Sequence, residues 1–529
     1  MFDLEIASEL LMEYLYESLY EYIAQPPLSA KIVFSAIIIV TFGLIATERL
    51  HKTVAALGGA VATLIAGGYF AYAYSWFPFF TYFNALPNII EAIGRGITPI
   101  VEWQPMLFSF TDVYKEFIDW STLLIIISVV IITTVASRSG LFEYLIIKVV
   151  KFSGGDIKRL FIYIWILTFL LTMFLNCDPC FIIVSVLVFQ IAKILDLNPK
   201  PYILGTIFVV NAASSSTIIG SFVNILVSGH YNLDPARYLS YPSFIVLGLP
   251  FAVIGTVVAL FFVFRHYKDA FQIPKEKEEY LRMREMLLSF DERSVMKDPK
   301  MFRRLSILLA ATIAGFIIAG LINVPFYVVS LVFAFAFLFV SGEDTEKTLR
   351  EVDWSLVFFF IGIFIIVGGV DKTKILEIMG NSLGTLIFAN TPATVILVST
   401  FCGGLSGVLD NISVTTALLY VTPSLSASAL INQNLVIWSL IYGADIGASL
   451  TPIGGLPNLI GVSALEKEGH HVSWKEFMKI GVSITAVTLI AGILLLLGFS
   501  RILGWGFDIS GLISPISKFL YNFDITQII

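Results

Sequence analysis

Two related stretches decide the fold of this chain: Ser214-Ser215-Ser216-Thr217-Ile218-Ile219-Gly220, and Gly447-Ala448-Ser449-Leu450-Thr451-Pro452-Ile453-Gly454-Gly455. They lie at the centres of two apolar segments, 201–228 and 433–461, which are longer than one membrane crossing needs. A helix with a polar, glycine-containing centre is predicted to be broken there. Backbone unwinds at membrane depth only where it lines a cavity or is buried in protein.

The composition of the whole chain is that of a membrane protein. Of its 529 residues, 57% are hydrophobic and 14% are charged, whereas a soluble domain carries about 25% charged residues. The apolar residues gather in runs of roughly 20, the length that spans the hydrocarbon core of a bilayer. We therefore predict an all-α polytopic membrane protein in the lipid bilayer, and the long unbroken runs exclude a β-barrel. The net charge of −6 gives no reason to expect nucleic acid as a partner.

Two other apolar segments, 160–195 and 393–428, are too long for one crossing and carry a polar interruption near the middle. The interruption is Asn176-Cys177-Asp178-Pro179 in the first and Asp410-Asn411 in the second. Each segment is either two crossings or a re-entrant hairpin whose polar tip lies inside the membrane. The half at 160–175 would be about 24 Å long as a helix, which is short for a full crossing.

An internal repeat organises the chain. One constant offset in residue number superposes Asp119-Trp120-Ser121 on Asp353-Trp354-Ser355 and Leu175-Asn176-Cys177 on Leu409-Asp410-Asn411. The same offset pairs four positions of the broken segments, namely Asn211 with Asp445, Thr217 with Thr451, Gly220 with Gly454 and Asn224 with Asn458. A gapless offset that holds from Asp119 to Asn224 indicates two copies of one unit, each containing a hairpin and a broken helix.

The distribution of charge predicts the topology. If both interrupted segments are hairpins, five crossings separate the matched Asp-Trp-Ser motifs, so the repeats are inverted. One side then collects 25 of the 33 Lys and Arg residues, in the loops near 48–52, 138–159, 193–200, 265–304, 342–353 and 462–479. This side is predicted to be cytoplasmic, with ten crossings, two hairpins and both termini outside. The predicted domains are an acidic interfacial segment 1–29, a first repeat 30–266, a cytoplasmic linker 267–302, a second repeat 303–500 and a C-terminal tail 501–529.

The sequence lacks the motifs of common enzyme classes, so we expect no catalytic activity. It contains no His-Glu-x-x-His, no Gly-x-Ser-x-Gly and no Walker loop. Without a Walker loop the chain cannot hydrolyse ATP, so pumping would use an ion gradient or a partner ATPase. No cofactor is expected apart from H⁺ or Na⁺ as the coupling ion.

Three carboxylates are expected at membrane depth: Asp178, Asp410 and Asp445. Each costs about 2.5–3.5 kcal/mol to insert at a helix centre. They either cap the broken helices or bind a proton or metal cation, because no Lys or Arg lies near them in these segments. Asp410, at a hairpin tip, is the predicted coupling residue. Asp445 is expected to matter less, because its counterpart Asn211 is already an amide.

Oxygen-bearing side chains surround the predicted breaks. Hydroxyl and amide oxygens suit Na⁺, while unwound backbone adds free carbonyls for a cation and helix N-termini for an anion. These candidate binding residues are Ser214, Ser215, Thr217, Asn224, Asn411, Ser449, Thr451 and Asn458. Ser and Thr also pack the interfaces between membrane helices, which is the alternative role for each of them.

The motifs carry a family resemblance. The doubled pattern of a polar hairpin tip followed by Thr-x-x-Gly-x-x-x-Asn resembles the ion-transporter superfamily. Four stretches are similar to its branch of arsenite permeases, NhaD-type antiporters and the melanosomal P protein, namely Thr47 to Ala56, Val352 to Leu356, Gly443 to Gly447 and Glu468 to Phe477. The resemblance covers about residues 30 to 500.

The resemblance implies a homodimer that works by elevator-like alternating access, with a scaffold domain and a mobile transport domain. It also implies two cation sites with the substrate between them. Carried onto this sequence, the first site is Asn176 with Thr217, Gly220 and Asn224, and the second, a Na⁺ site, is Asp410 and Asn411 with Thr451, Gly454 and Asn458. At the first tip Asn176-Cys177 replaces the family's Asp-Asn, which puts the first cation site in doubt.

The predicted function is a secondary active transporter of the cell membrane. It would move a small anion or metalloid oxyacid, arsenite-like or carboxylate-like, coupled to H⁺ or Na⁺. The thiol of Cys177 suits arsenite, although free Cys is among the most buried residue types. A carboxylate would need helix N-termini and a bound cation, because no intramembrane Arg is available. The alternatives are a Na⁺/H⁺ antiporter, which needs only the carboxylates, and an ion channel, which would lack coupling.

Overall fold

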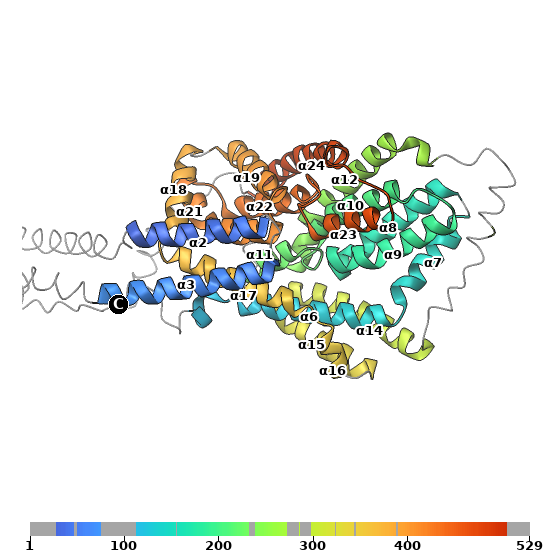
Figure 1. Ribbon diagram of the computed structural model, residues 1–529, viewed down its shortest axis with the longest axis horizontal. Coiled ribbons are helices and arrows are strands. Elements are labelled where there is room, and N and C mark those ends of the chain that lie inside the picture. Colours follow the sequence, from blue (N-terminus) through green and yellow to red (C-terminus); the bar gives the residue numbers. More distant parts are fainter. Residues whose placement is uncertain are drawn as a thin grey trace, which may run out of the picture. The chain divides into compact units, whose positions relative to one another are not determined.

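The computed structural model describes residues 28–46, 50–75, 113–154, 156–231, 239–271, 285, 298–322, 324–342, 345–387 and 390–504, and these residues form helices without any strand (Figure 1). This confirms the all-α prediction. The acidic segment 1–29, the linker 267–302 and the tail 501–529 lie mostly outside the described residues.

The helices of the first half are α2 (Leu28–Ala46), α3 (Lys52–Ser75), α6 (Trp120–Arg138), α7 (Leu141–Phe152), α8 (Ile157–Leu175), α9 (Cys177–Ile194), α10 (Lys200–Ala213), α11 (Phe222–His230) and α12 (Tyr241–His266). Those of the second half are α14 (Pro299–Leu321), α15 (Phe326–Ser341), α16 (Thr345–Arg350), α17 (Trp354–Asp371), α18 (Ile375–Leu386), α19 (Thr391–Ser406), α20 (Asn411–Leu419), α21 (Thr422–Ala429), α22 (Gln433–Gly447), α23 (Leu456–Lys467) and α24 (Trp474–Ile502). Within the described part of the chain, nine helices are long and apolar enough to cross a membrane.

The helix boundaries confirm the internal repeat. Helices of the two repeats begin at positions related by the same constant offset, in the pairs α6 and α17, α7 and α18, α8 and α19, α9 and α20, and α11 and α23. Both predicted breaks are present, since α10 is separated from α11 and α22 from α23. In each of the segments 160–195 and 393–428, two helical arms meet at the predicted polar tip, as α8 with α9 and α19 with α20. Helices α8 and α9 are each long and apolar enough to cross a membrane, so the re-entrant hairpin stays a prediction.

Three short helices depart from the sequence-based prediction: α7, its counterpart α18 in the second repeat, and α16, which lies in the predicted loop 342–353. The sequence predicts a loop over 138–159, yet this region contains the amphipathic helix α7. Helix α7 is only 12 residues long and includes Glu143, Lys148 and Lys151, so it has no long apolar run. It buries one face instead, through Leu141, Phe142, Ile146, Ile147 and Val150.

The chain divides into two compact units that cut across the repeats. The first unit comprises Met1–Ile118 and Phe358–Met379, so it joins α2 and α3 to most of α17. Small residues let these helices approach closely, because a methyl group added at Gly362 would overlap the backbone of Ala56. Lys52 lies over the ring of Phe359 at 5.1 Å from its centroid, which ties the start of α3 to α17.

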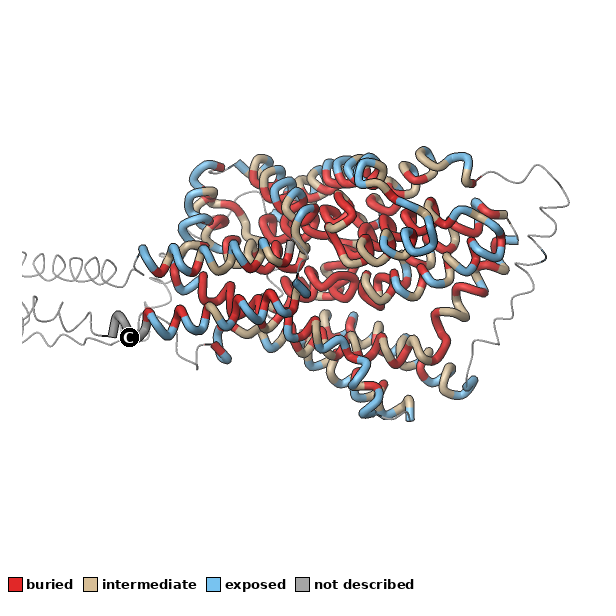
Figure 2. The backbone as a smooth tube through the Cα atoms, in the orientation of Figure 1, coloured by how far each residue is buried: buried red, intermediate tan, exposed pale blue. Residues whose placement is uncertain are grey.

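The second unit, Asp119–Val357 with Gly380–Ile529, contains both hairpins and both broken helices. Helices α10 and α22 form its core: every residue from 201 to 213 and from 434 to 447 is buried, as Figure 2 shows in red. Helix α10 packs against α8, α9, α12 and α23 (Figure 1), and α22 packs against α19, α20 and α24. A helix that is apolar on all sides can be surrounded by protein in this way or face lipid, and α10 and α22 are surrounded by protein.

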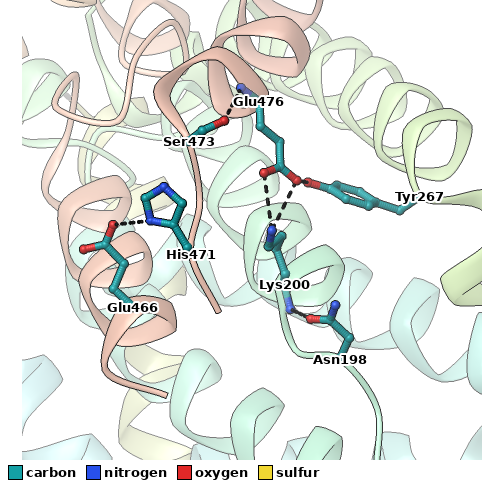
Figure 3. A network of polar contacts seen from close by, with 7 residues as sticks. All are labelled: Asn198, Lys200, Tyr267, Glu466, His471, Ser473 and Glu476. Carbon is teal, nitrogen blue, oxygen red and sulfur yellow. Dashed lines mark hydrogen bonds and ion pairs between the residues drawn. The ribbon is translucent and has the colours of Figure 1, made fainter. Parts of the chain in front are cut away.

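Polar contacts join several loops at one end of the second unit (Figure 3). Lys200, at the start of α10, forms an ion pair of 3.3 Å with Glu476, at the start of α24. The hydroxyl of Tyr267, just after α12, donates to the same carboxylate at 2.8 Å, and burial together with Glu476 raises the pKa of Tyr267. Arg138 and Glu351 connect two more loops of the predicted cytoplasmic group through a 2.9 Å hydrogen bond.

We expect the Glu476 network to contribute modestly to stability. Glu476→Gln removes the ion pair and weakens the bond from Tyr267, so it should lower the free energy of unfolding by about 1 kcal/mol, since the group is partly exposed. Glu466→Gln is the control, because Glu466 pairs with the exposed His471 at 3.5 Å and should change stability by less than about 0.5 kcal/mol. Thermal unfolding of the two purified variants in detergent measures the difference, and equal losses would contradict it.

Candidate functional site

The first broken helix is held in shape by one buried amide. Helix α10 ends at Ala213, a 3-10 turn covers Ser214–Ser216, and α11 begins at Phe222. Serine hydroxyls compete for backbone groups and so favour helix ends over helix interiors. Across the break, the Nδ2 of Asn224 donates to the carbonyl oxygens of Ser214 at 2.9 Å and Thr217 at 2.8 Å. The amide therefore satisfies two carbonyls that the interrupted helix leaves without partners.

The second broken helix repeats this arrangement. Pro452 and the pair Gly454-Gly455 separate α22 from α23, because proline lacks the amide hydrogen that a helix needs. The Nδ2 of Asn458 donates to the carbonyl oxygens of Ala448 at 2.6 Å and Thr451 at 2.8 Å. These partners occupy the repeat-related positions of Ser214 and Thr217, so the repeat extends to individual hydrogen bonds.

Each hairpin tip is docked onto the break of its own repeat. The hydroxyl of Thr217 donates to the carbonyl oxygen of Met173 at 2.8 Å, at the end of α8. The matched Thr451 hydroxyl donates to the carbonyl of Gly407 after α19. The first tip has one further bond, from the N–H of Cys177 to the carbonyl oxygen of Gly220 at 3.0 Å. Hairpin and broken helix are therefore parts of one packed structure in each repeat.

The two hairpin tips differ in backbone conformation. Asn176, between α8 and α9, is buried and has φ 70° and ψ 153°, a region that is almost restricted to glycine. Asp410, before α20, has φ −57° and ψ 130° and is half-buried. Its carboxylate accepts bonds from the N–H of Ser413 at 3.3 Å and from the Ser413 hydroxyl at 3.4 Å. Asp410 thus acts as the N-cap of α20.

The strained backbone at the first tip predicts that the stability difference between glycine and alanine variants has opposite signs at the two matched tip positions. Asn176→Gly relieves the positive φ that Asn176→Ala retains, so we expect the glycine variant to be more stable than the alanine variant by about 1–2 kcal/mol. Both substitutions remove the hydrogen bond that the Oδ1 of Asn176 accepts from the N–H of Asp178 at 3.3 Å as the N-cap of α9, so this loss cancels in the comparison. At Asp410 the order should reverse, with alanine at least as stable as glycine. Thermal unfolding of the four variants in detergent measures this, and the same order at both positions would refute it.

The second unit brings most of the predicted site residues together across the two repeats. The Nδ2 of Asn211, on α10, donates to the Oδ1 of Asn458, on α23, at 2.9 Å. At the matched position, Asp445 of α22 has Ser214, Ser221 and Asn224 of the first repeat as its polar neighbours. Asp445 is 1% exposed, and neither of its oxygens accepts a hydrogen bond from the described residues. This carboxylate is the least satisfied group at the site.

The remaining predicted residues have varied surroundings. Ser215 donates to the carbonyl oxygen of Ala212 at 3.2 Å, while the hydroxyl of Ser449 is buried and has no partner among the described residues. Asp178 is half-buried beside Cys177, whose thiol donates to it at 3.3 Å. Asn411 begins α20 and is half-buried. Across the described ranges no group of three or more His, Cys, Asp or Glu side chains could hold a metal ion by itself.

Two residues beside Asp445 are absent from the candidates that the sequence indicates. Ser221 is one of its polar neighbours, and Cys402 of α19 lies within electrostatic range of its carboxylate. Ser221 faces the second repeat rather than its own hairpin, so a motif read within one repeat does not include it. The signal that could find it is the repeat itself, because a contact between Asn211 and Asn458 requires a matched contact between Asp445 and Asn224.

The chain is similar to known membrane proteins over most of its length. Residues 42–443 and 395–510 match a family model described as "Citrate transporter" (CitMHS). A 46 kDa membrane protein of Mycobacterium leprae (strain TN) is 23% identical over 472 residues, which cover 89% of this chain and 99% of that protein. An uncharacterized transporter of Mycobacterium tuberculosis (strain ATCC 25618 / H37Rv) is 23% identical over 461 residues, 87% of this chain and 96% of that protein. The arsenical pump membrane protein of Escherichia coli (strain K12) is 24% identical over 380 residues, 70% of this chain and 85% of that protein.

Proposed function

Because this chain belongs to the citrate transporter family, we propose that it is a secondary active carrier driven by an H⁺ or Na⁺ gradient. It is an integral membrane protein and a transporter; the substrate class and the coupling are what we propose. The observation that carries the proposal is the buried contact between the two broken helices at Asp445, beside the first hairpin tip. Unwound backbone inside a membrane protein is stable where it binds an ion or a solute.

The proposed substrate is a small anion or metalloid oxyacid. Helices α11 and α23 both begin inside the breaks, and helix N-termini present free N–H groups and a partial positive charge to an anion. Helix α22 contains no Lys or Arg, so a bound cation would supply the remaining positive charge. One similar protein is named an arsenical pump and the family model is named for citrate, and both names fit this substrate class.

A Na⁺/H⁺ antiporter is the second candidate, and one observation favours it. Neither oxygen of the buried Asp445 carboxylate accepts a hydrogen bond from the described residues, and an antiporter needs little more than such a group to exchange the two cations. An ion channel, the third class, would let its solute equilibrate and could not accumulate it.

Uptake into liposomes that contain the purified protein separates these functions. Labelled citrate, with and without a divalent metal, arsenite and ²²Na⁺ are each offered under an imposed pH gradient and under an imposed Na⁺ gradient. We expect citrate or arsenite to accumulate above its outside concentration, and only while a gradient is present. Accumulation of ²²Na⁺ alone would establish the antiporter, and flux that stops at equal concentrations would establish a channel. Empty liposomes provide the background.

We also propose a place and an orientation for the carrier: the cell membrane, with the Lys- and Arg-rich loops in the cytoplasm. The three native cysteines are buried, so single introduced cysteines can be labelled over a low background. Asp269→Cys, after α12, should react with an impermeant thiol reagent from the cytoplasmic side, and Glu116→Cys from the outside. Reaction of both from the same side would disprove the two-hairpin topology.

The proposed mechanism is elevator-like alternating access in a homodimer. Its support is the family resemblance together with the docking of both hairpins onto the broken helices, which makes them able to move as one body. Light scattering of the protein in detergent should give the mass of two chains. A monomer that still transports solute would remove the dimer from the mechanism.

A further inference from the structure

The repeat relates two side-chain contacts between the broken helices that differ in chemistry. Asn211 and Asn458 form one contact, and Asp445 and Asn224, at the matched positions, form the other. In the first contact an amide N–H meets an amide oxygen at 2.9 Å, which is an ordinary hydrogen bond. In the second, a carboxylate takes the place of the donating amide.

Asn224 has no hydrogen left for that carboxylate. Its Nδ2 carries two hydrogens, and these are donated to the carbonyl oxygens of Ser214 and Thr217. What remains is the Oδ1 of Asn224, which is buried and has no partner in the described part of the chain, as is true of both oxygens of Asp445. An amide oxygen and a carboxylate are both acceptors, so they cannot bond to each other without an added positive charge.

The side chains around the second contact supply further oxygen atoms. Ser214 and Ser221 stand where the other repeat has Ala448 and Gly455. Ser214 donates its hydrogen to the carbonyl of Asn211 at 2.7 Å, and Ser221 accepts the N–H of Val223 at 3.1 Å. The surroundings of Asp445 are therefore rich in oxygen lone pairs, whereas those of Asn211 have apolar groups at both positions.

No cationic side chain among the described residues compensates Asp445. The titratable groups within range of its charge are the thiols of Cys177, at the first hairpin tip, and Cys402, on α19. Among the described residues that face it, Ser214, Ser221 and Asn224 are neutral. A fully buried carboxylate in such surroundings is stable only when a proton or a cation neutralises it.

We infer that one cation, H⁺ or Na⁺, binds between Asp445 and the first broken helix, and that the matched contact of Asn211 with Asn458 binds none. Its ligands are the carboxylate of Asp445, the Oδ1 of Asn224 and the hydroxyl oxygens of Ser214 and Ser221. The inference rests on the proposed carrier function and deepens it by naming the coupling site. Asp410, by contrast, already has bonds to Ser413 as a helix cap.

The test is the dependence of thermal stability on cations in the purified full-length protein, which needs no substrate. The melting temperature is measured in NaCl or N-methylglucamine chloride at pH 6, 7.5 and 9. Without Na⁺, the melting temperature of the parent should fall as the pH rises, because a proton held in the folded state is lost. If Na⁺ can replace the proton, each tenfold increase in its concentration at high pH should raise the melting temperature by roughly 1–2 °C. A response to pH without any response to Na⁺ identifies the proton as the ligand.

Two substitutions exchange the side-chain types of the two contacts: one replaces the carboxylate by an amide, and the other replaces an amide by a carboxylate. Asp445→Asn creates a second amide pair, so this variant should remain folded and lose its dependence on Na⁺ and on pH. Asn211→Asp, added to Asp445→Asn, places a carboxylate against the Oδ1 of Asn458, whose N–H groups are also both donated, so the double variant should regain cation dependence. Asp410→Asn tests the rival site at the second hairpin tip, and on this inference it keeps the response of the parent. Should Asp445→Asn fail to fold, Ser214→Ala with Ser221→Gly gives the same test by weakening cation binding at least tenfold.

Each outcome decides the matter. Loss of the response in Asp445→Asn together with its return in the double variant Asp445→Asn with Asn211→Asp supports the site. A parent without cation dependence, or loss of the response in Asp410→Asn but not in Asp445→Asn, overturns it. Uphill transport by a protein that lacks this dependence would leave the carrier function standing without the site. Cation-dependent stability without uphill transport would leave the site standing without the carrier function.

Discussion

Asn458→Leu is expected to destabilise the protein more than any other single substitution at the site. Leucine approximates the shape of asparagine but has no hydrogen-bonding groups. The change leaves three buried groups without partners, namely the carbonyls of Ala448 and Thr451 and the Nδ2 of Asn211. Each unsatisfied buried group costs about 1–3 kcal/mol, so the loss should be roughly 3–6 kcal/mol after local relaxation.

The related position provides the comparison. Asn224→Leu leaves two carbonyls without partners instead of three groups, so it should be the milder change by about 1–3 kcal/mol. Adding Asn211→Leu to Asn458→Leu removes the third unpaired group and should recover part of the loss, which a double-mutant cycle measures as a coupling energy. Thermal unfolding in detergent gives the order, and equal melting temperatures for the parent and Asn458→Leu would show that the amide does not hold the break.

Gly447→Val is the second large effect that we expect. Gly443 and Gly447 line the face of α22 that contacts α19, and a methyl group added at Gly447 would overlap the backbone of Gly403. Backbone cannot move aside as a side chain can, so the helices must separate, and the cost should be about 3 kcal/mol or more. Gly404→Val is the matched control, because a methyl group there meets nothing within 4 Å. The ratio of folded to aggregated protein on size-exclusion chromatography reports the difference, and similar profiles for the two variants would contradict the close contact.

The sequence predicts the fold in outline because the decisive signals are local. A polar stretch inside an apolar run indicates a broken helix, and an exact repeat offset indicates that the break occurs twice; both predictions are confirmed by α10 with α11 and α22 with α23. Helix α7 escapes prediction, because an amphipathic helix of 12 residues has no long apolar run. Local patterns therefore find the long helices and miss the short helices α7, α16 and α18.

The sequence predicts which residues belong to the candidate site, but not which of these residues contact one another. The sequence ranks Asp410 above Asp445, because Asp410 lies at a hairpin tip and the counterpart of Asp445, Asn211, is already an amide. Our inference reverses this order, because Asp410 caps α20 while neither oxygen of Asp445 accepts a hydrogen bond from the described residues. The choice of carbonyl to which each amide donates its hydrogens is set by packing. That packing is between segments that lie in different halves of the sequence. No pattern within one segment contains that information.

The first unit contains helices from both repeats, and this has a consequence for biosynthesis. In the first unit, α3 ends at Ser75 and its partner in α17 begins at Phe358, so everything from position 76 to position 357 must be translated between them. At about 5–20 residues per second, α2 and α3 wait roughly 15–60 seconds for that partner. During this interval their small-residue faces, around Ala56 and Gly59, can contact only lipid or the insertion machinery. Termination of translation before codon 358 would therefore release a membrane-inserted intermediate that is prone to degradation, however complete the first repeat already is.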